Sequence, residues 1–503
     1  MSIYSRLINN ISSEELYKGL LAHGLFSEKL PPFLTSEQFY NYSKSVNHQF
    51  AKKPNEYIYY ENMRNINIPR PLGIPNPFSY QQLCKCLEDN WERLQSHFTN
   101  MTANEKHKVS RIHIRKMANK NSLFVMNYDN YRIDGSPEED LIIGKRYMVK
   151  ADISTCFPSI YTHALAWALV GEQEAKNNQR DERLWYNQID FYTRNTTNGE
   201  THGLLIGPHT SNLLSEIILT KIDSQLSTKW DYIRNIDDYT CYVSAYEDTQ
   251  SFLLELSEQL RAYGLTLNHK KTEVVELPKA AVEQWVRRIN AFSIFRDKEY
   301  LNYKEVRAYL DLAIELMQEN KKNSAILNYA IKVLGKQKLT SNAKNYCVKT
   351  IFHLLLLYPY LIPLLDEYVF APFHVSISEI SDISQMIYNN GIRTQNYEAT
   401  SYAVYFSLKY KFKLDNVKIE DVLKSNSCIF LLLAYLSAIH TDNRTDIKKY
   451  KEHAENLSKN ESDFNRNWLF IYEVLPQSKL KNEWKNLKRK HITFIKPFDN
   501  SIS

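Results

Sequence analysis

Glycine, cysteine and long apolar runs are scarce in this sequence. Only 12 of the 503 residues are glycine, which argues against a glycine-rich nucleotide loop as the main binding device and favours long helices. The six cysteines are scattered, and the pair Cys84 and Cys86 has no second pair nearby. Neither a disulfide framework nor a zinc site is therefore expected, which fits a reducing cytoplasmic compartment.

Segments that target or anchor a chain in a membrane are also lacking. The N-terminal segment is polar and does not have the pattern of a signal peptide. The longest apolar run, from Ile351 to Leu365, contains two prolines and a histidine and is shorter than a membrane span requires. We expect a buried helix pair there and no membrane association.

The bulk composition is that of an ordinary globular protein. The hydrophobic fraction is 43%, the charged fraction is 24% and the formal charge is +6. A chain of 503 residues is too long for one core, so we expect two or three domains. The mild positive charge permits nucleic-acid binding without requiring it, because only clustering on one face would indicate it.

The first 280 or so residues mix helices with strands. The proline-rich segment from Ile68 to Pro77 must be non-helical, and Ser79 to His97 has the period of an amphipathic helix. Tyr147 to Ile153 is a mostly apolar strand that contains Asp152, and Tyr232 to Val243 predicts two short strands with Asp237 and Asp238 at their turn. Further helices are expected at Glu37 onward, Tyr161–Gly171, Ser211–Asp223 and Asp248–Tyr263.

From about residue 285 the strand signals fade and apolar residues recur at helical spacing. Helices of this kind joined by polar turns predict an antiparallel helical array or solenoid, although no fixed repeat period is present. The basic tail from Lys479 to Lys490 is either a solvated helix face or a nucleic-acid contact. The candidate helices are Val306–Met317, Ser324–Leu334, Ala343–Leu357 and Cys428–Ile439.

Three aspartates suggest the chemistry. Asp152 ends one strand, and Asp237 and Asp238 lie on a hairpin tip. Phosphoryl transfer at a nucleotide uses two divalent ions about 3.5–4 Å apart, and Mg²⁺ prefers hard oxygen ligands. Carboxylates on adjacent strands are suited to hold such ions, although an Asp-Asp pair alone is common by chance.

Around these aspartates the sequence resembles the reverse transcriptases. Ala151 to Tyr161 is similar to their motif A, and Gly203 to Glu216 to motif B. Ile233 to Tyr239 is similar to motif C, and Tyr263 to Glu273 to motif D. The four motifs occur in the family's order at the spacing of a palm domain. The resemblance implies an α+β fingers and palm domain over residues 1–285, and the helical periods predict a helical domain over residues 286–503.

The resemblance also implies roles for individual residues. Asp152 and Asp237 would bind Mg²⁺ (or Mn²⁺) in a two-metal site, with Asp238 as the adjacent acid and the Ile153 carbonyl facing a metal. Phe157 would exclude a ribose 2′-hydroxyl and so favour dNTPs, or it is an ordinary core residue. The remaining implied residues are Gly207 and Pro208, near the templating base and incoming nucleotide, and Lys271, near the leaving pyrophosphate.

A basic segment precedes motif A. Arg111 to Arg115 alternates basic and apolar residues, which predicts a strand with one basic face at the fingers position. Arg111, Arg115 and Lys116 would clamp the triphosphate there. Plain surface charge is an equally weighted alternative.

Two departures from the common pattern point to one branch of the family. Asn235 replaces the aromatic residue that usually stands two positions before the acid pair, and a long helical segment follows the palm where a small thumb is expected. With Tyr161 to Leu165 after motif A, these features resemble the abortive-infection (Abi) reverse transcriptases of bacteria, the phage-defence class that includes AbiK. That resemblance implies template-independent DNA synthesis primed by a tyrosine hydroxyl, a HEAT-like helical domain and homo-oligomers. Tyr17 is the candidate priming residue among 35 tyrosines.

Three functions follow as alternatives. The first is an untemplated, protein-primed DNA polymerase whose single-stranded DNA product is attached to the protein. The second is a conventional RNA-templated reverse transcriptase. The third is a non-catalytic scaffold that keeps the palm fold, which the three clustered aspartates argue against, because unpaired carboxylates repel one another.

Overall fold

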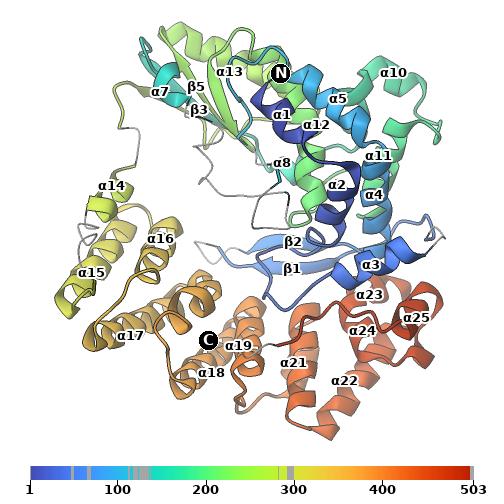
Figure 1. The fold of residues 1–503 in the computed structure, drawn as a ribbon, viewed down its shortest axis with the longest axis vertical. Coiled ribbons are helices and arrows are strands. Elements are labelled where there is room, and N and C mark those ends of the chain that lie inside the picture. Colours follow the sequence, from blue (N-terminus) through green and yellow to red (C-terminus); the bar gives the residue numbers. More distant parts are fainter. Residues whose placement is uncertain are drawn as a thin grey trace.

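The computed structural model describes residues 2–46, 50–64, 69–111, 114–116, 123, 135, 137–280, 283–291 and 299–498. An α+β part and a helical part follow one another along the chain (Figure 1). In Figure 1 the helical part, yellow to red, curves below the α+β part. Among the helices of the described residues, none is long and apolar enough to cross a membrane.

The palm is built on a four-stranded antiparallel sheet with the order β4-β5-β3-β6. Its strands are β3 (Tyr147–Asp152), β4 (Tyr232–Asn235), β5 (Asp238–Val243) and β6 (Glu273–Glu276). Helices α12 (His209–Leu226) and α13 (Tyr246–Arg261) pack beside it (Figure 1). The predicted strands, the hairpin and the helices over this region are confirmed.

Further helices of the N-terminal segment and of the palm complete the α+β part. They include α1 (Ile3–Asn9), α2 (Ser13–Leu21), α3 (Glu37–Ser45), α9 (His163–Val170), α10 (Glu172–Asn177) and α11 (Trp185–Asn195). Short helices α7 (Glu138–Leu141) and α8 (Cys156–Ser159) flank β3 in the sequence. α12 is buried on nearly all sides because α5 (Trp91–Met101), α9 and α13 pack against it.

The single helix expected from Ser79 to His97 is wrong. Two helices occupy the segment, α4 (Pro77–Asp89) and α5 (Trp91–Met101). Asn90 separates them with a non-helical backbone (φ −110°, ψ 14°), and its side chain Nδ2 donates to the carbonyl of Cys86 at 2.9 Å. A short amide side chain competes with the helical hydrogen bonds in this way, which the apolar period alone does not reveal.

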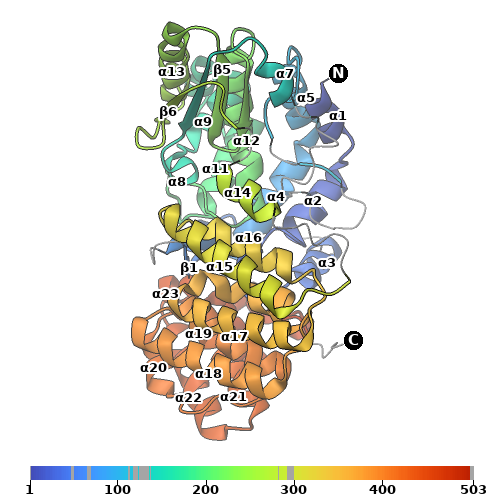
Figure 2. The same ribbon diagram turned by 90° about the vertical axis from the view of Figure 1, so that its left-hand side faces the viewer.

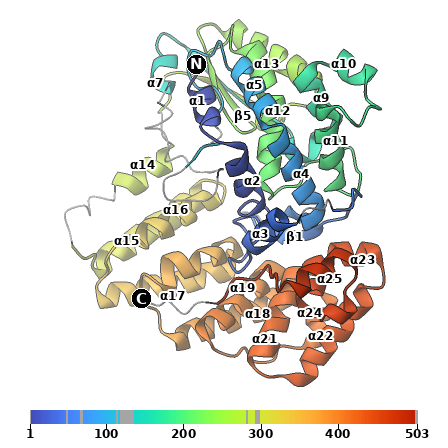
Figure 3. The same cartoon turned by 45° about the vertical axis from the view of Figure 1, so that its right-hand side comes forward.

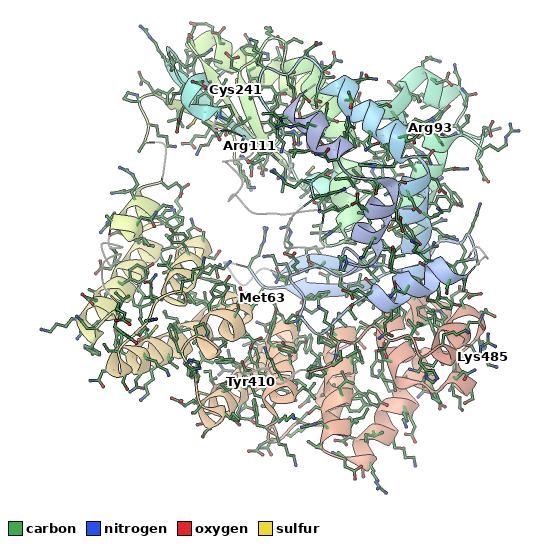
Figure 4. The ribbon with its side chains drawn as sticks, in the orientation of Figure 1. Met63, Arg93, Arg111, Cys241, Tyr410 and Lys485 are labelled. Carbon is green, nitrogen blue, oxygen red and sulfur yellow. The ribbon has the colours of Figure 1, made fainter. Side chains whose placement is uncertain are left out.

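A hairpin of β1 (Ile58–Asn62) and β2 (Arg70–Ile74) lies between the two parts of the molecule (Figure 3). Within the proline-rich segment, residues 69–76 are non-helical, as predicted, whereas Pro77 is the first residue of α4 and residue 68 lies outside the described residues. The Gly73 N–H donates to the carbonyl of Ile206 at 2.9 Å, which holds β2 beside the loop that precedes α12. On the other side, Asn62 Nδ2 and the Met63 N–H donate to the buried carboxylate of Glu398 at 2.7 and 2.6 Å. Figure 4 shows Met63 at this junction.

The helical part is an array of short helices that stack below the α+β part (Figure 2). All four helices predicted there are present, as α15, α16, α17 and α21, and the HEAT-like classification stays a prediction. The domain boundary predicted near residue 285 also stays a prediction, and it falls at the start of α14. The helices are α14 (Gln284–Ala291), α15 (Tyr303–Glu319), α16 (Ser324–Leu334), α17 (Ser341–Leu357), α18 (Ile377–Thr394), α19 (Tyr397–Tyr410), α20 (Ile419–Lys424), α21 (Cys428–His440), α22 (Arg444–Leu457), α23 (Glu461–Arg466), α24 (Trp468–Val474) and α25 (Asn482–Arg489).

The apolar run from Ile351 to Leu365 is only partly buried, with Leu357 55% exposed, and it is not a pair of α-helices. Its first half ends α17, and its second half is the 3₁₀ helix Pro359–Leu364, followed by the π-helical turn Asp366–Phe370. Proline lacks the N–H that an α-helix needs at an interior position, so Pro363 favours the irregular second half.

The C-terminal segment returns to the N-terminal part of the chain. Leu34 and Ile495 form an antiparallel bridge, and Phe494, which is 0% exposed, packs against Phe39 and Trp468. The basic tail is partly structural, because Lys488 donates to the carbonyls of Tyr472 and Glu473. Lys485 lies on the outer surface (Figure 4).

Candidate catalytic site

Three carboxylates meet at the end of the palm sheet. Asp152 is the last residue of β3 and pairs in register with Asp238, the first residue of β5, while Asp237 lies in the turn between β4 and β5. One ligand oxygen from each carboxylate lies within 4.8 Å of the others. Antiparallel pairing therefore brings together residues that are 85 and more positions apart, as the sequence predicted.

Burial and mutual repulsion raise the pKa values of two of these acids. Burial and the charge of Asp152 raise the pKa of Asp237. Partial burial, a hydrogen bond with Asp152 and the charge of Asp237 raise the pKa of Asp238 to about 6. Carboxylates this close favour either shared protons or a bound cation.

Two residues of the loop after α13 hold Asp152. Lys271 Nζ lies 2.7 Å from Asp152 Oδ2, and the Asn268 side chain donates to Asp152 Oδ1 at 2.9 Å. The Asn268 N–H also donates to the Asp152 carbonyl at 2.7 Å. The structure thus places Lys271 with the aspartates, and it adds Asn268, which the sequence reasoning missed although it is part of the same motif.

The segment after Asp152 is fixed by backbone hydrogen bonds. The Ile153 N–H donates to the carbonyl of Asp237 at 3.0 Å, which joins the ends of β3 and the hairpin. Thr155 has a left-handed backbone (φ 43°) and turns the chain into α8, which carries the half-buried Phe157. The Phe157 carbonyl accepts from the Leu204 N–H at 2.8 Å. The predicted roles of the Ile153 carbonyl and the Phe157 ring stay predictions.

The loop before α12 requires glycine. Gly207 has φ +131°, and a Cβ there would meet the Gly73 carbonyl and the Ser27 side chain at 3.4 Å. Pro208 follows as the N-cap residue of α12. The β1–β2 hairpin therefore touches this loop directly, and the predicted contacts of Gly207 and Pro208 with a nucleotide stay predictions.

The basic residues predicted to clamp the triphosphate have other contacts. Arg111 donates to the Gly135 carbonyl at 3.0 Å and lies 3.9 Å from Glu138, near the palm sheet (Figure 4). Arg115 is buried, and exposed Lys116 pairs with Glu15 at 2.7 Å. Two of the residues between Arg111 and Arg115, numbers 112 and 113, lie outside the described residues, so the predicted basic strand is not described as a whole.

Arg70 on β2 also interacts electrostatically with Asp237. Burial and the neighbouring Arg64 lower the pKa of Arg70, while Asp237 acts in the opposite direction. The charge of Arg70 in turn opposes the rise in the Asp237 pKa. The sequence reasoning missed Arg70 because it stands in a proline-rich segment with no basic pattern around it.

Tyr17, the predicted priming residue, does not lie with the three aspartates. It is 4% exposed on α2, and its hydroxyl contacts Ser43 Oγ at 3.0 Å and accepts from Gln81 Nε2 at 2.9 Å. Burial raises its pKa to about 12. Tyr17 lines a pocket of about 490 Å³ among α2, α3, α4 and α11, and none of the three aspartates lines that pocket.

The donor set fits divalent metal. Oxygen ligands from three carboxylates, one of them nearly fully buried, are what Mg²⁺ and Mn²⁺ bind, whereas zinc sites use His and Cys. The six cysteines are buried and unpaired.

Comparison with known proteins identifies the domain. A family model described as "Reverse transcriptase (RNA-dependent DNA polymerase)" matches residues 69–324, about half of the chain. No curated protein matches the chain.

Solved structures give only weak similarity. A C-terminally truncated apo telomerase from Candida tropicalis is 15% identical, with 49% of this chain and 55% of that chain covered and a TM-score of 0.28. The apo telomerase of the same organism is 12% identical, with 81% and 72% covered and a TM-score of 0.33. A Candida albicans telomerase in complex with a telomeric RNA fragment is 12% identical, with 70% and 65% covered and a TM-score of 0.28. The chain thus spans about half the length of the first of these, and such TM-scores support no conclusion.

Proposed function

Because the chain belongs to the reverse transcriptase (RNA-dependent DNA polymerase) family, and is thus a nucleotidyltransferase, we propose that it adds dNTPs without a template from a protein tyrosine primer, as a phage-defence enzyme. The observation that carries the catalytic part is the cluster of Asp152, Asp237 and Asp238. The untemplated and defence parts rest on the resemblance of the motifs to the Abi reverse transcriptases.

Asp152, Asp237 and Asp238 would hold Mg²⁺, with Mn²⁺ as a substitute. When bound, the metal pair would supply activation of the attacking oxygen and stabilisation of the negative charge on the phosphate. Lys271, whose pKa is raised by its hydrogen bond with Asp152, is a cation at neutral pH and would neutralise the leaving pyrophosphate. Arg70 would contribute a second positive charge on the fingers side.

Two features support a reaction without an ordinary nucleic-acid primer. Asn235 stands on the hairpin in place of an aromatic residue, two positions before Asp237, and so changes the surface beside the primer end. The segment after the palm is a helical array from α14 onward. The alternative, RNA-templated synthesis, is the activity that the family description names.

The tyrosine that primes is proposed to be Tyr17. Its burial and its bonds to Ser43 and Gln81 mean that attack would require the hydroxyl to leave this environment. Deprotonation in place is unfavourable, because burial raises the pKa to about 12. Residues 1–285 would carry the reaction, and residues 286–503 would form a HEAT-like domain in a homo-oligomer in the bacterial cytoplasm.

One experiment separates the alternatives. Purified protein is incubated with Mg²⁺ and labelled dNTPs, with no template or primer, and denatured products are resolved. Label that migrates with the protein supports untemplated, protein-primed synthesis, and label that appears only with an RNA template and a primer supports conventional reverse transcription. If no label is incorporated under either condition, so that the wild type gives the same result as an Asp237→Ala variant, the non-catalytic scaffold is the remaining alternative.

Matched variants sharpen the result. Asp382→Asn changes an exposed aspartate of α18 and should leave activity unchanged, whereas Asp152→Asn should abolish it. Tyr17→Phe should remove the protein-linked label, while Tyr388→Phe, a buried tyrosine of the helical part, should retain it. Label on another tyrosine, found by mass spectrometry, would reject Tyr17 and keep the mechanism.

A further inference from the structure

Arg234 is a fully buried arginine of the catalytic hairpin. It lies on β4, three residues before Asp237, and is 0% exposed. Successive strand residues point to opposite faces, so Arg234 shares its face with Tyr232 and not with Asn235. Both Tyr232 and Arg234 contact Asp223 of α12, which defines this face as the one against that helix.

All N–H groups of the Arg234 guanidinium have acceptors. Nε and Nη2 donate to Asp223 Oδ2 at 2.9 and 2.6 Å, and Nη1 and Nη2 donate to Glu216 at 3.2 Å each. The remaining Nη1 bond goes to the carbonyl of Ile236 at 2.8 Å. These five bonds use the full donor capacity of a guanidinium, which lysine cannot reproduce.

The Ile236 carbonyl belongs to the peptide bond between Ile236 and Asp237. Ile236 has a left-handed backbone (φ 58°), a conformation that is costly for a β-branched residue. The hydrogen bond from Arg234 fixes the orientation of this peptide from one side. From the other side, the Asp237 carbonyl accepts the Ile153 N–H at 3.0 Å. The turn is therefore held at both peptides that flank Asp237.

The two carboxylates that accept from Arg234 are also held in place. Glu216 and Asp223 lie on α12, the helix that follows the Gly207 loop. Tyr4 and Ser110 donate to Glu216, and Tyr232 donates to Asp223 at 2.8 Å. Both carboxylates are at most 1% exposed, so salt does not screen their attraction to Arg234. The guanidinium thus joins the rigid helix to the catalytic turn.

We propose that Arg234 is a positioning residue for catalysis: it holds the Ile236–Asp237 peptide so that Asp237 and Asp238 face Asp152 in a metal-binding arrangement, and it sets that turn relative to α12. This rests on the proposed metal site. Groups that orient metal ligands without touching the metal are usually required for affinity, and their loss weakens binding about 10–100-fold.

The test uses the full chain and measures metal binding without nucleotide. Mn²⁺ affinity is determined by electron paramagnetic resonance for the wild type, Arg234→Lys and Glu216→Gln, together with kcat and KM for dTTP. Arg288→Lys is the matched control, because Arg288 pairs with Glu319 at 3.1 Å on the exposed surface of the helical part.

Arg234→Lys should weaken Mn²⁺ binding by about 10-fold or more and lower kcat by a similar factor, with KM for dTTP within about twofold. Glu216→Gln should also weaken Mn²⁺ binding and lower kcat, but by smaller factors. Adding Ile236→Asn to Arg234→Lys should recover part of the Mn²⁺ affinity, because asparagine adopts the left-handed conformation more readily than isoleucine. A purely structural role would not predict this recovery.

Circular dichroism establishes which variants fold. A folded Arg234→Lys variant with wild-type Mn²⁺ affinity and kcat would overturn the proposal. If Arg234→Lys does not fold, wild-type values in folded Glu216→Gln overturn it instead. Failure of the wild type to bind Mn²⁺ overturns the metal site and this inference together, whereas Mn²⁺ binding without untemplated synthesis rejects only the proposed reaction.

Discussion

Replacing Lys271 by methionine should have opposite effects on metal binding and on turnover. Lys271 Nζ lies 2.7 Å from Asp152 Oδ2, so its ammonium group stands beside an oxygen that the proposed site offers to a metal. A cation at this place competes electrostatically with a divalent ion. Methionine keeps the unbranched chain and removes the charge, so the variant should bind metal more tightly without nucleotide and react more slowly with it.

The size of the binding effect follows from exposure. The Lys271 side chain is 62% exposed and that of Asp152 is 5% exposed. Exposed ion pairs contribute about 0.2–1 kcal/mol, and the buried partner places this pair at the upper end. About 1 kcal/mol corresponds to roughly fivefold tighter binding. Asn268 still holds the other oxygen of Asp152 at 2.9 Å, so the carboxylate should keep its position.

The assay is a titration with Mn²⁺ of the wild type, Lys271→Met and Lys270→Met. Lys270 is the exposed neighbouring lysine, and its side chain forms no ion pair within the described part of the chain. Lys270→Met therefore controls for the loss of one positive charge from the surface. Metal affinity in Lys271→Met that is equal to or weaker than that of Lys270→Met would refute the competition between Lys271 and the metal.

Phe157→Ala should lower the preference for dNTPs over rNTPs by about 10-fold or more, measured as the ratio of the two kcat/KM values. An unchanged ratio would show that Phe157 is only a core residue. Glu105→Gln tests a buried acid, because burial and the charge of Asp223 raise the Glu105 pKa from 4.5 to about 8. As the pH rises through that interval, the wild type should lose on the order of 4 kcal/mol of stability relative to the variant. Urea unfolding at pH 5 and pH 8.5 measures this difference, and parallel pH profiles would contradict it. Phe494→Ala should cost about 3–5 kcal/mol of unfolding free energy, because the ring is 0% exposed between Phe39 and Trp468, and a loss below about 1 kcal/mol would show that the C-terminal segment is not anchored there.

The local sequence was enough to predict the elements that carry the aspartates. The mostly apolar run from Tyr147 to Ile153 predicted β3, and the two short strand signals over Tyr232 to Val243 predicted β4 and β5. Order and spacing of four motifs then predicted that Asp152, Asp237 and Asp238 meet, and the structure brings them within 4.8 Å. Helical periods likewise predicted α15, α16, α17 and α21, because a repeating apolar stripe is a local property of the chain.

Tertiary structure decided which charged residues stand beside those aspartates. The sequence predicted Lys271 at the site, and it gave Arg111, Arg115 and Lys116 as a triphosphate clamp with plain surface charge as an equal alternative. It did not single out Arg70, whose charge opposes the rise in the Asp237 pKa, or Arg234, which donates to the Ile236 carbonyl. A lone arginine has the same sequence signature whether it is solvated on a surface or buried between two carboxylates. The contacts of Arg234 join β4 to Glu216 and Asp223 on α12, and pairing across such separations depends on how helix and sheet pack, which no local period encodes.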